Sequence, residues 1–219
     1  MTLVKTTIDR RSFLKASAAA GGGLMISFNW LAGVTDAQGA IADPAETWNN
    51  LNSYISISSD GIITLMSPNP EFGSNVKTSM PMIVAEELDV DWKDVVVEQA
   101  DFFPKRFDRQ FTGGSQAIRQ SWKTLRTAGA TARQMLLEAA AKTWNVNISE
   151  LTTRAGKIYH TASGKEAGYG QMASRASEMI VPGSVNLKSV KDFSIIGTSR
   201  KNVEGKNIVS GKPLFTIDY

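Results

Sequence analysis

Residues 112–136, TGGSQAIRQSWKTLRTAGATARQML, give the clearest secondary-structure signal in this chain. It opens with two glycines and a serine, a common way for a loop to enter a helix. Apolar or small residues then recur at alternating spacings of four and three, which gives a helix with one apolar face. We therefore expect a long helix that approaches a sheet or another helix closely where that face is small. The face consists of Ile118, Trp122, Leu125, Gly129, Ala132 and Leu136.

The segments before this helix alternate between strand and helix signals. Two β-rich runs, residues 54–58 and 62–66, flank an Asp-Gly pair, which is a strong hairpin signal. Two prolines and a glycine within residues 67–75 then exclude regular structure. Beyond them, apolar residues spaced by four predict a helix over residues 76–88. The β-branched run at 95–97 predicts a short buried strand.

The segments after the long helix are shorter. We expect a short helix over residues 149–152, a hairpin around residues 155–157, and a helix over residues 169–179. The fold class is therefore mixed α/β, or α+β, with short hairpins and one long helix.

The N-terminal residues have the pattern of an export signal. Arg10 and Arg11 are followed by Ser-Phe-Leu-Lys and by an uncharged apolar stretch, residues 16–31, that contains three glycines. This pattern is typical of twin-arginine signals, which export already folded proteins to the periplasm or cell envelope. The stretch is short for a bilayer span, so the membrane is expected as a transient partner. Residues 40–42, Ala-Ile-Ala, offer a cleavage site; an uncleaved, anchoring signal is the alternative.

Composition excludes several classes of function. The chain has 219 residues, 42% hydrophobic and 21% charged, as in a globular protein. It has no cysteine and one histidine, so it cannot by itself build a thiolate iron–sulfur site or an imidazole metal cluster. The first 42 residues carry four basic and two acidic groups, so about +1 of the formal net charge of +3 remains for the rest. Such a charge gives no reason to expect nucleic acid as a partner.

Two loops that lead into helices could carry chemistry. A glycine-containing loop at a helix N-terminus exposes unpaired N–H groups at the positive end of the helix dipole, and such places bind phosphates. Simple capping is the alternative for either loop alone. No complete set of catalytic or metal-ligating residues accompanies them. The candidate residues are Gly73, Ser74 and Asn75 in the first loop and Gly113, Gly114, Ser115 and Gln116 in the second.

Other charged residues are given structural roles or none. Arg119, Arg126 and Arg133 repeat every seven residues and so share one stripe of the long helix, which is either a solvated face or a docking stripe for another segment or subunit. His160 is expected at the surface without a role. The two glutamates at 86–87 are adjacent, so their carboxylates should diverge rather than form a catalytic pair.

Five segments together carry a specific resemblance to a known family. They are similar to the molybdopterin-binding large subunit of the isoquinoline 1-oxidoreductase and aldehyde dehydrogenase group, within the xanthine oxidase family. The similarity runs through most of residues 50–219, and a twin-arginine leader is usual in this group. The segments are DGIITL (60–65), PEFGSNVKT (70–78), MIVAEEL (82–88), GGSQAIR (113–119) and LRTAGA (125–130).

This resemblance implies that both loops contact a molybdopterin cytosine dinucleotide, at its pyrophosphate and its cytidine nucleotide. The first loop departs from the family pattern, in which Gly-Gln-Gly is usual. Ser74 and Asn75 stand where Gln and Gly are expected. The change removes a long amide that could reach the molybdenum centre, while the main-chain donors could remain.

The resemblance also implies how the chain is organised. Residues 1–42 would be the signal, residues 43–210 part of the molybdopterin-binding domain, and residues 211–219 the start of the next domain. The family's general-base glutamate lies near the end of a much longer subunit and has no counterpart here. We therefore expect a component of a molybdenum hydroxylase that oxidises aldehydes or N-heterocycles, inactive alone. It would need the rest of the large subunit and a small [2Fe-2S] subunit; a non-catalytic truncated binding or assembly module is the alternative.

Overall fold

The computed structural model describes residues 24–26, 54–107 and 109–218. The twin-arginine motif and the Ala-Ile-Ala cleavage site expected from the sequence lie outside these residues. The helices and strands are β1 (Leu24–Ile26), β2 (Ile55–Ile57), β3 (Ile63–Ser67), α3 (Val76–Leu88), β4 (Val95–Gln99), α4 (Ala117–Trp144), β5 (Leu151–Arg154), β6 (Lys157–His160), β7 (Lys165–Gly168), α5 (Tyr169–Ser177) and α6 (Gly205–Val209).

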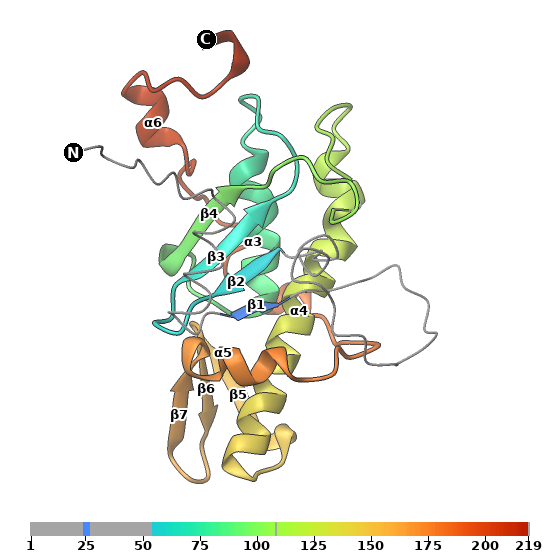
Figure 1. The fold of residues 1–219 in the computed structure, drawn as a ribbon, viewed down its shortest axis with the longest axis vertical. Coiled ribbons are helices and arrows are strands. Elements are labelled where there is room, and N and C mark those ends of the chain that lie inside the picture. The colour runs from blue at the N-terminus through green and yellow to red at the C-terminus, as the bar shows by residue number, and fades with distance from the viewer. Residues whose placement is uncertain (1–23, 27–53, 108, 219) are drawn as a thin grey trace, which may run out of the picture.

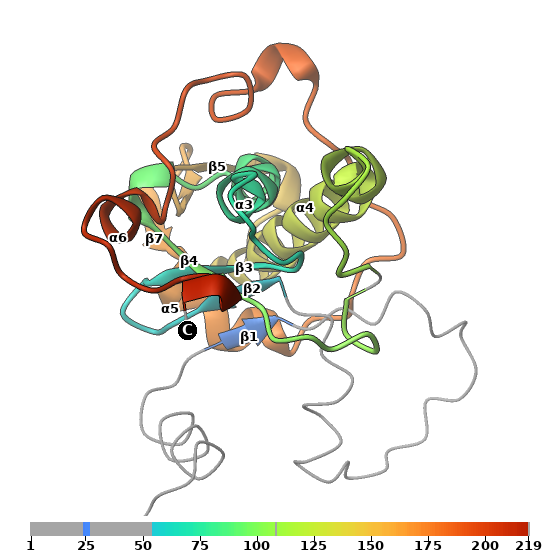
Figure 2. The ribbon, with the colours of Figure 1, turned by 90° about the horizontal axis from the view of Figure 1, so that it is seen from above.

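Two small sheets and two packed helices form the architecture (Figure 1). The larger sheet has the strand order β1-β2-β3-β4; its first three strands pair antiparallel, and β4 pairs parallel to β3. Helix α3 connects these parallel strands. Figure 2 shows α3 and α4 on one side of this sheet and α5 on the other, beside β1 and β2. The second sheet, β5-β6-β7, is antiparallel throughout.

The contact between α3 and α4 forms much of the core, and Gly129 makes it possible. A Cβ atom at Gly129 would lie 2.4 Å from the Val84 carbonyl oxygen and 2.9 Å from the Glu87 Cβ. Leu125 and Leu136, one turn or more to either side on α4, are fully buried. The apolar face and the close approach predicted from the sequence are therefore confirmed, and the opposing element is a helix.

The structure corrects three local expectations. Residues 148–150 form a single turn of 3-10 helix, and β5 begins at Leu151, where a helix was expected to continue. Strand β4 is an edge strand, and Val96 is 45% exposed rather than buried. His160 is buried because β6 places its ring between Glu150 and Ser163, whose oxygens lie 2.9 and 2.6 Å from the ring nitrogens.

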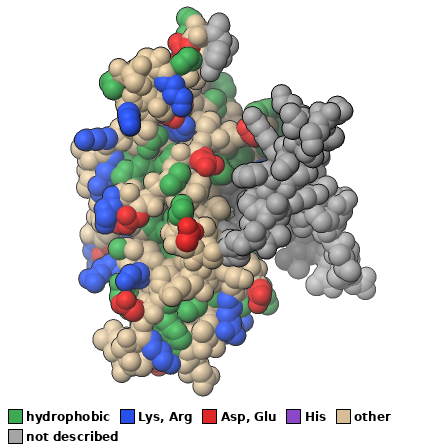
Figure 3. Space-filling model, turned by 60° about the vertical axis from the view of Figure 1, so that its left-hand side comes forward, with side chains coloured by type: hydrophobic (Ala, Val, Ile, Leu, Met, Phe, Trp, Pro, Cys, Tyr) green, Lys and Arg blue, Asp and Glu red, His purple; other side chains and the backbone are tan. Residues whose placement is uncertain are grey.

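Basic and acidic side chains are interspersed on the face seen in Figure 3. Among the helices that the structure describes, none combines the length and apolar character needed to cross a bilayer.

Candidate anion-binding site at two helix N-termini

The first loop (residues 68–75) precedes α3, and the second loop (residues 111–116) precedes α4, at the same end of the molecule (Figure 1). Asn69 is fully buried, and its Nδ2 donates to the Phe111 carbonyl at 2.7 Å. In the other direction, the Thr112 hydroxyl donates at 2.8 Å to a main-chain carbonyl of the first loop. The two loops singled out from the sequence are therefore hydrogen-bonded neighbours, with the positive ends of two helices close by.

In the first loop, Glu71 pairs the N–H groups of two of the three candidate residues. The Glu71 carboxylate accepts from the main-chain N–H groups of Gly73 at 2.6 Å, Asn75 at 2.9 Å and Lys77 at 2.9 Å. Gly73 has φ 102°, a conformation that favours glycine. The loop thus holds a carboxylate where a ligand anion would otherwise bind, and of its three candidate residues only Ser74 keeps an N–H without an acceptor in the described chain.

The second loop leads into a helix whose first N–H groups are unpaired among the described residues, although the N–H of Gln116 itself donates to the Gly113 carbonyl at 3.1 Å. Gly114 and Ser115 are both left-handed, with φ 56° and 57°, and α4 has neither a side-chain cap nor an acidic residue in its first turn. Within the described chain, the main-chain N–H groups of Ala117, Ile118 and Arg119 have no acceptor. These unpaired donors at the start of a 28-residue helix suit an anion. Simple capping by Ser115, the alternative left open by the sequence, does not occur.

Local contacts fix the shape of the second loop. Gly114, with φ 56°, is the position where the loop depends on glycine, because larger residues rarely adopt this left-handed conformation. The Gln116 amide oxygen accepts from Arg119 Nη2 at 2.6 Å and from Gln120 Nε2 at 2.9 Å. The guanidinium of Arg119 is thus held by the Gln116 side chain at the start of α4.

Three buried side-chain oxygens near the first loop have no hydrogen-bond partner in the described chain. They are Ser67 Oγ, Asn69 Oδ1 and Asn75 Oδ1. Ser67 and Asn69 are fully buried at the end of β3. Buried polar atoms normally find partners, and unpaired ones concentrate where a ligand or water completes the structure.

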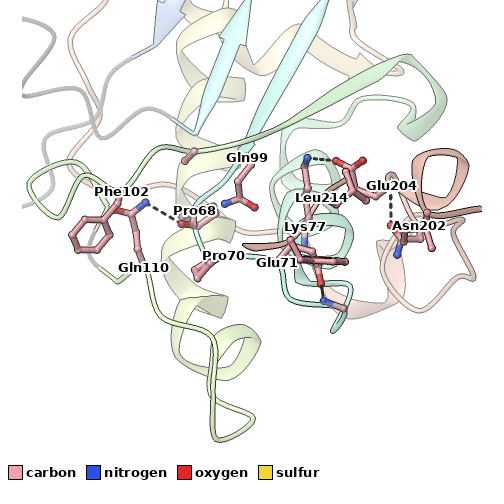
Figure 4. Close-up of a pocket in the computed structure, with 14 residues that line it drawn as sticks. Pro68, Pro70, Glu71, Lys77, Gln99, Phe102, Gln110, Asn202, Glu204 and Leu214 are labelled. Atoms are coloured by element: carbon pink, nitrogen blue, oxygen red, sulfur yellow. Dashed lines mark hydrogen bonds and ion pairs between the residues drawn. The ribbon is translucent and has the colours of Figure 1, made fainter. Parts of the chain in front are cut away.

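A pocket of about 310 Å³ adjoins the other side of the first loop (Figure 4). Lys77 on α3 and Glu204 before α6 form an ion pair across it. The Lys77 ammonium, followed by the Asn207 amide, lowers the pKa of Glu204 below its ordinary value. Since Glu71 and Glu204 both face this pocket, it suits an anion less well than the second loop does.

A buried acidic pair anchors the segment after α5 to the two packed helices. Glu86 and Glu87 at the end of α3 are both fully buried, and they point to different partners. Glu87 accepts from Arg126 Nε at 2.7 Å and lies 3.9 Å from Arg133 Nη2. The same arginines donate to main-chain carbonyls of residues 186–188. Arg126 and Arg133, two of the three arginines that share a stripe of α4, therefore bind another segment of this chain. This is the docking role that the sequence left open beside a solvated face.

Glu86 holds the next part of that segment. Its Oε2 accepts from the main-chain N–H groups of Ser194, Ile195 and Ile196 at 2.9, 2.6 and 3.0 Å, and Lys188 Nζ lies 3.3 Å from its Oε1. Burial raises the pKa of Glu86, but these N–H groups and the Lys188 ammonium outweigh burial, so the net shift is downward. The two glutamates thus diverge, as expected, and serve as structural anchors.

Sequence reasoning missed the residues that organise the site. Asn69 and Glu71 act through contacts across the loops, which no local pattern reveals. The burial of Glu86 and Glu87 could have been suspected only from their place on the apolar side of a short helix. Among the described residues, no group of histidine, cysteine or acidic side chains could hold a metal ion.

In this mixed α/β domain, two neighbouring loops each lead into the N-terminus of a helix. Such an arrangement is suited to binding a phosphate-bearing cofactor. The chain belongs to the molybdopterin cofactor-binding domain family, whose sequence model matches residues 20–211. A second model, of the twin-arginine translocation signal, matches residues 7–27. The two matches confirm the predicted family and the predicted export by the twin-arginine pathway, with Arg10 and Arg11 inside the matched signal.

The chain is similar to longer proteins of known type. It is 35% identical over 144 residues to the isoquinoline 1-oxidoreductase subunit beta of Brevundimonas diminuta, covering 61% of this chain and 18% of that protein. It is 26% identical over 171 residues to a membrane-bound aldehyde dehydrogenase of Gluconacetobacter polyoxogenes, covering 75% and 22%. The chain therefore spans about a fifth of the length of these relatives.

The chain is also similar to a solved structure, that of a reconstituted CO dehydrogenase from Oligotropha carboxidovorans. It matches at 16% identity with a TM-score of 0.45, over 75% of this chain and 21% of the other.

Proposed function

We propose that this chain contributes one wall of a molybdopterin dinucleotide site in a molybdenum hydroxylase that oxidises aldehydes or N-heterocycles. The observation that carries the proposal is the row of unpaired N–H groups at Ala117, Ile118 and Arg119, next to the left-handed pair Gly114 and Ser115. Membership of the molybdopterin-binding family and the likeness to oxidoreductase subunits support it.

The second loop fits the pyrophosphate of such a cofactor. Residues 113–116 and the first turn of α4 would hold it, with main-chain donors, the helix dipole and the Arg119 side chain all favouring negative charge. The molybdenum centre of the bound cofactor would supply the oxidising chemistry. The cytosine dinucleotide is the form proposed here, since the resemblance from sequence implies it.

The first loop would line the site in a different way. Gly73 and Asn75 donate to Glu71, so their N–H groups would reach a cofactor only if that carboxylate moved away. Ser74, which is exposed, would then meet the polar edges of the ligand. We propose that the first loop positions the second through Asn69 and adds polar contacts, while the second loop binds the pyrophosphate.

The remaining parts of the enzyme would come from elsewhere. The chain supplies no thiolate for an iron–sulfur cluster, so a small [2Fe-2S] subunit is proposed as the electron-transfer partner. Segments corresponding to the rest of the relatives' length would enclose the cofactor and supply the general base. Main-chain hydrogen bonds from one loop, worth about 0.5–1.5 kcal/mol each, hold a large charged cofactor only weakly.

Binding of cytidine diphosphate to the purified chain tests the role of the second loop. We expect saturable amide shift changes at residues 113–119 in NMR titrations, with a Kd on the order of 1 mM and weaker binding at high salt. Gly114→Val should abolish saturation, because valine is strained at the left-handed φ of 56° that the loop requires there. Gly183→Val is the matched control, since a Cβ at Gly183 meets no atom within 4 Å. Equal binding by both variants would contradict the assignment.

A further inference from the structure

Strand β1 lies inside the stretch matched as an export signal. Residues Leu24–Ile26 pair antiparallel with β2, with Leu24 opposite Ile57 and Ile26 opposite Ile55. Helix α5 packs beside both strands (Figure 2). Strand β2 is thereby an interior strand of the sheet, and Ile55 and Ile57 are fully buried.

The hydrogen bonds of β2 show which of its residues depend on β1. The Tyr54 carbonyl accepts from Met66 N, and Ser58 N donates to the Ile62 carbonyl. The main-chain N–H and C=O groups of Tyr54 and Ser58 therefore point toward β3. Because successive residues of an antiparallel strand face opposite neighbours, the main-chain groups of Ile55 and Ile57 point toward β1. Without β1, these buried groups would lose their partners and β2 would become an open edge.

The two family models support the same assignment independently of the strand pairing. The molybdopterin-binding domain model begins at residue 20, and the signal model ends at residue 27, so the two overlap over residues 20–27. This overlap contains all of β1. The segment thus belongs to the export signal and to the domain at once.

We propose that residues 24–26 serve twice, as part of the export signal and as an edge strand of the folded domain, and that the leader is therefore retained after export. Cleavage after Ala42 would detach this strand from the domain, leaving only a three-residue pairing to hold it. The proposal does not depend on the cofactor or on the proposed function.

The mass of the exported protein tests retention. The full chain with a C-terminal tag is expressed in a Gram-negative host, and the periplasmic form is purified and weighed by intact mass spectrometry. We expect an N-terminus at residue 1 or 2; a form that begins at Asp43 would overturn the proposal. A variant with Arg10→Lys and Arg11→Lys should stay in the cytoplasm, which establishes that the periplasmic form used the twin-arginine pathway.

A matched pair of proline variants tests the strand itself. The N–H of Ile26 faces β2, whereas the N–H of Met25 points away from it, as the alternation above requires. Ile26→Pro in the full chain should therefore lower the Tm by about 4–8 °C or prevent soluble expression, while Met25→Pro should melt within about 2 °C of the parent. Equal melting temperatures for the two variants would overturn the structural role of β1.

Discussion

Gly129→Leu is expected to destabilise the protein by about 3 kcal/mol or more, at or above the upper end of the usual range for overpacking. The reason is that a side chain at this position meets the backbone of α3, with the Val84 carbonyl oxygen 2.4 Å from the Cβ position. Backbone cannot move aside as the end of a flexible side chain can, so α3 and α4 would have to separate. Thermal or urea unfolding of the purified chain measures the effect.

The control for this prediction is Lys123→Leu, at an exposed position of the same helix. It should change stability by less than about 0.5 kcal/mol. An unchanged unfolding midpoint in the Gly129 variant would mean that α4 does not present this face to α3.

Glu86→Ala should cost about 3–5 kcal/mol, the range typical of removing one partner from a buried charged network. The substitution leaves the N–H groups of Ser194, Ile195 and Ile196 without their acceptor and deprives Lys188 of one counter-charge. Unfolding measurements at pH 7 report the loss, and residues 186–196 should gain amide hydrogen exchange. Glu166→Ala is the control, since its ion pair with Lys157 is half exposed and should be worth less than about 1 kcal/mol.

Acid titration gives the Glu86 prediction a second readout. The folded-state pKa of Glu86 lies below its ordinary value of 4.5. A carboxyl with a depressed pKa stabilises the fold fully above that ordinary value and loses its contribution as the pH falls through the folded-state pKa. The parent should therefore lose stability below about pH 4.5, and Glu86→Ala should lose less over the same range. Parallel pH profiles for the two proteins would contradict this.

The elements with regular periodicity were predictable from the sequence. The long helix, its apolar face, the Asp-Gly hairpin and the helix before residue 88 all follow from local spacing, and the structure confirms them. The close approach at Gly129 was predictable because small residues on an apolar face allow one.

Features set by contacts between distant segments were not predictable. His160 looked like a surface residue, since nothing local shows that β6 buries its ring against Glu150. The β-branched run at 95–97 looked buried, but its exposure depends on the sheet order, which leaves β4 at an edge. The two candidate loops could be identified singly, whereas their joining through Asn69 and the occupation of one by Glu71 required the folded structure.

We propose that the second loop forms part of a molybdopterin site that other segments complete, and molybdenum content is the most direct measure of such a site. The chain purified alone should hold well under one molybdenum per chain, while the assembly with the rest of the large subunit and its iron–sulfur partner should hold about one. Gly114→Val should remove most of the metal from that assembly, because it strains the left-handed loop, and Gly183→Val should leave it in place. Stoichiometric molybdenum in the isolated chain, or full retention by the Gly114 variant, would contradict this proposal.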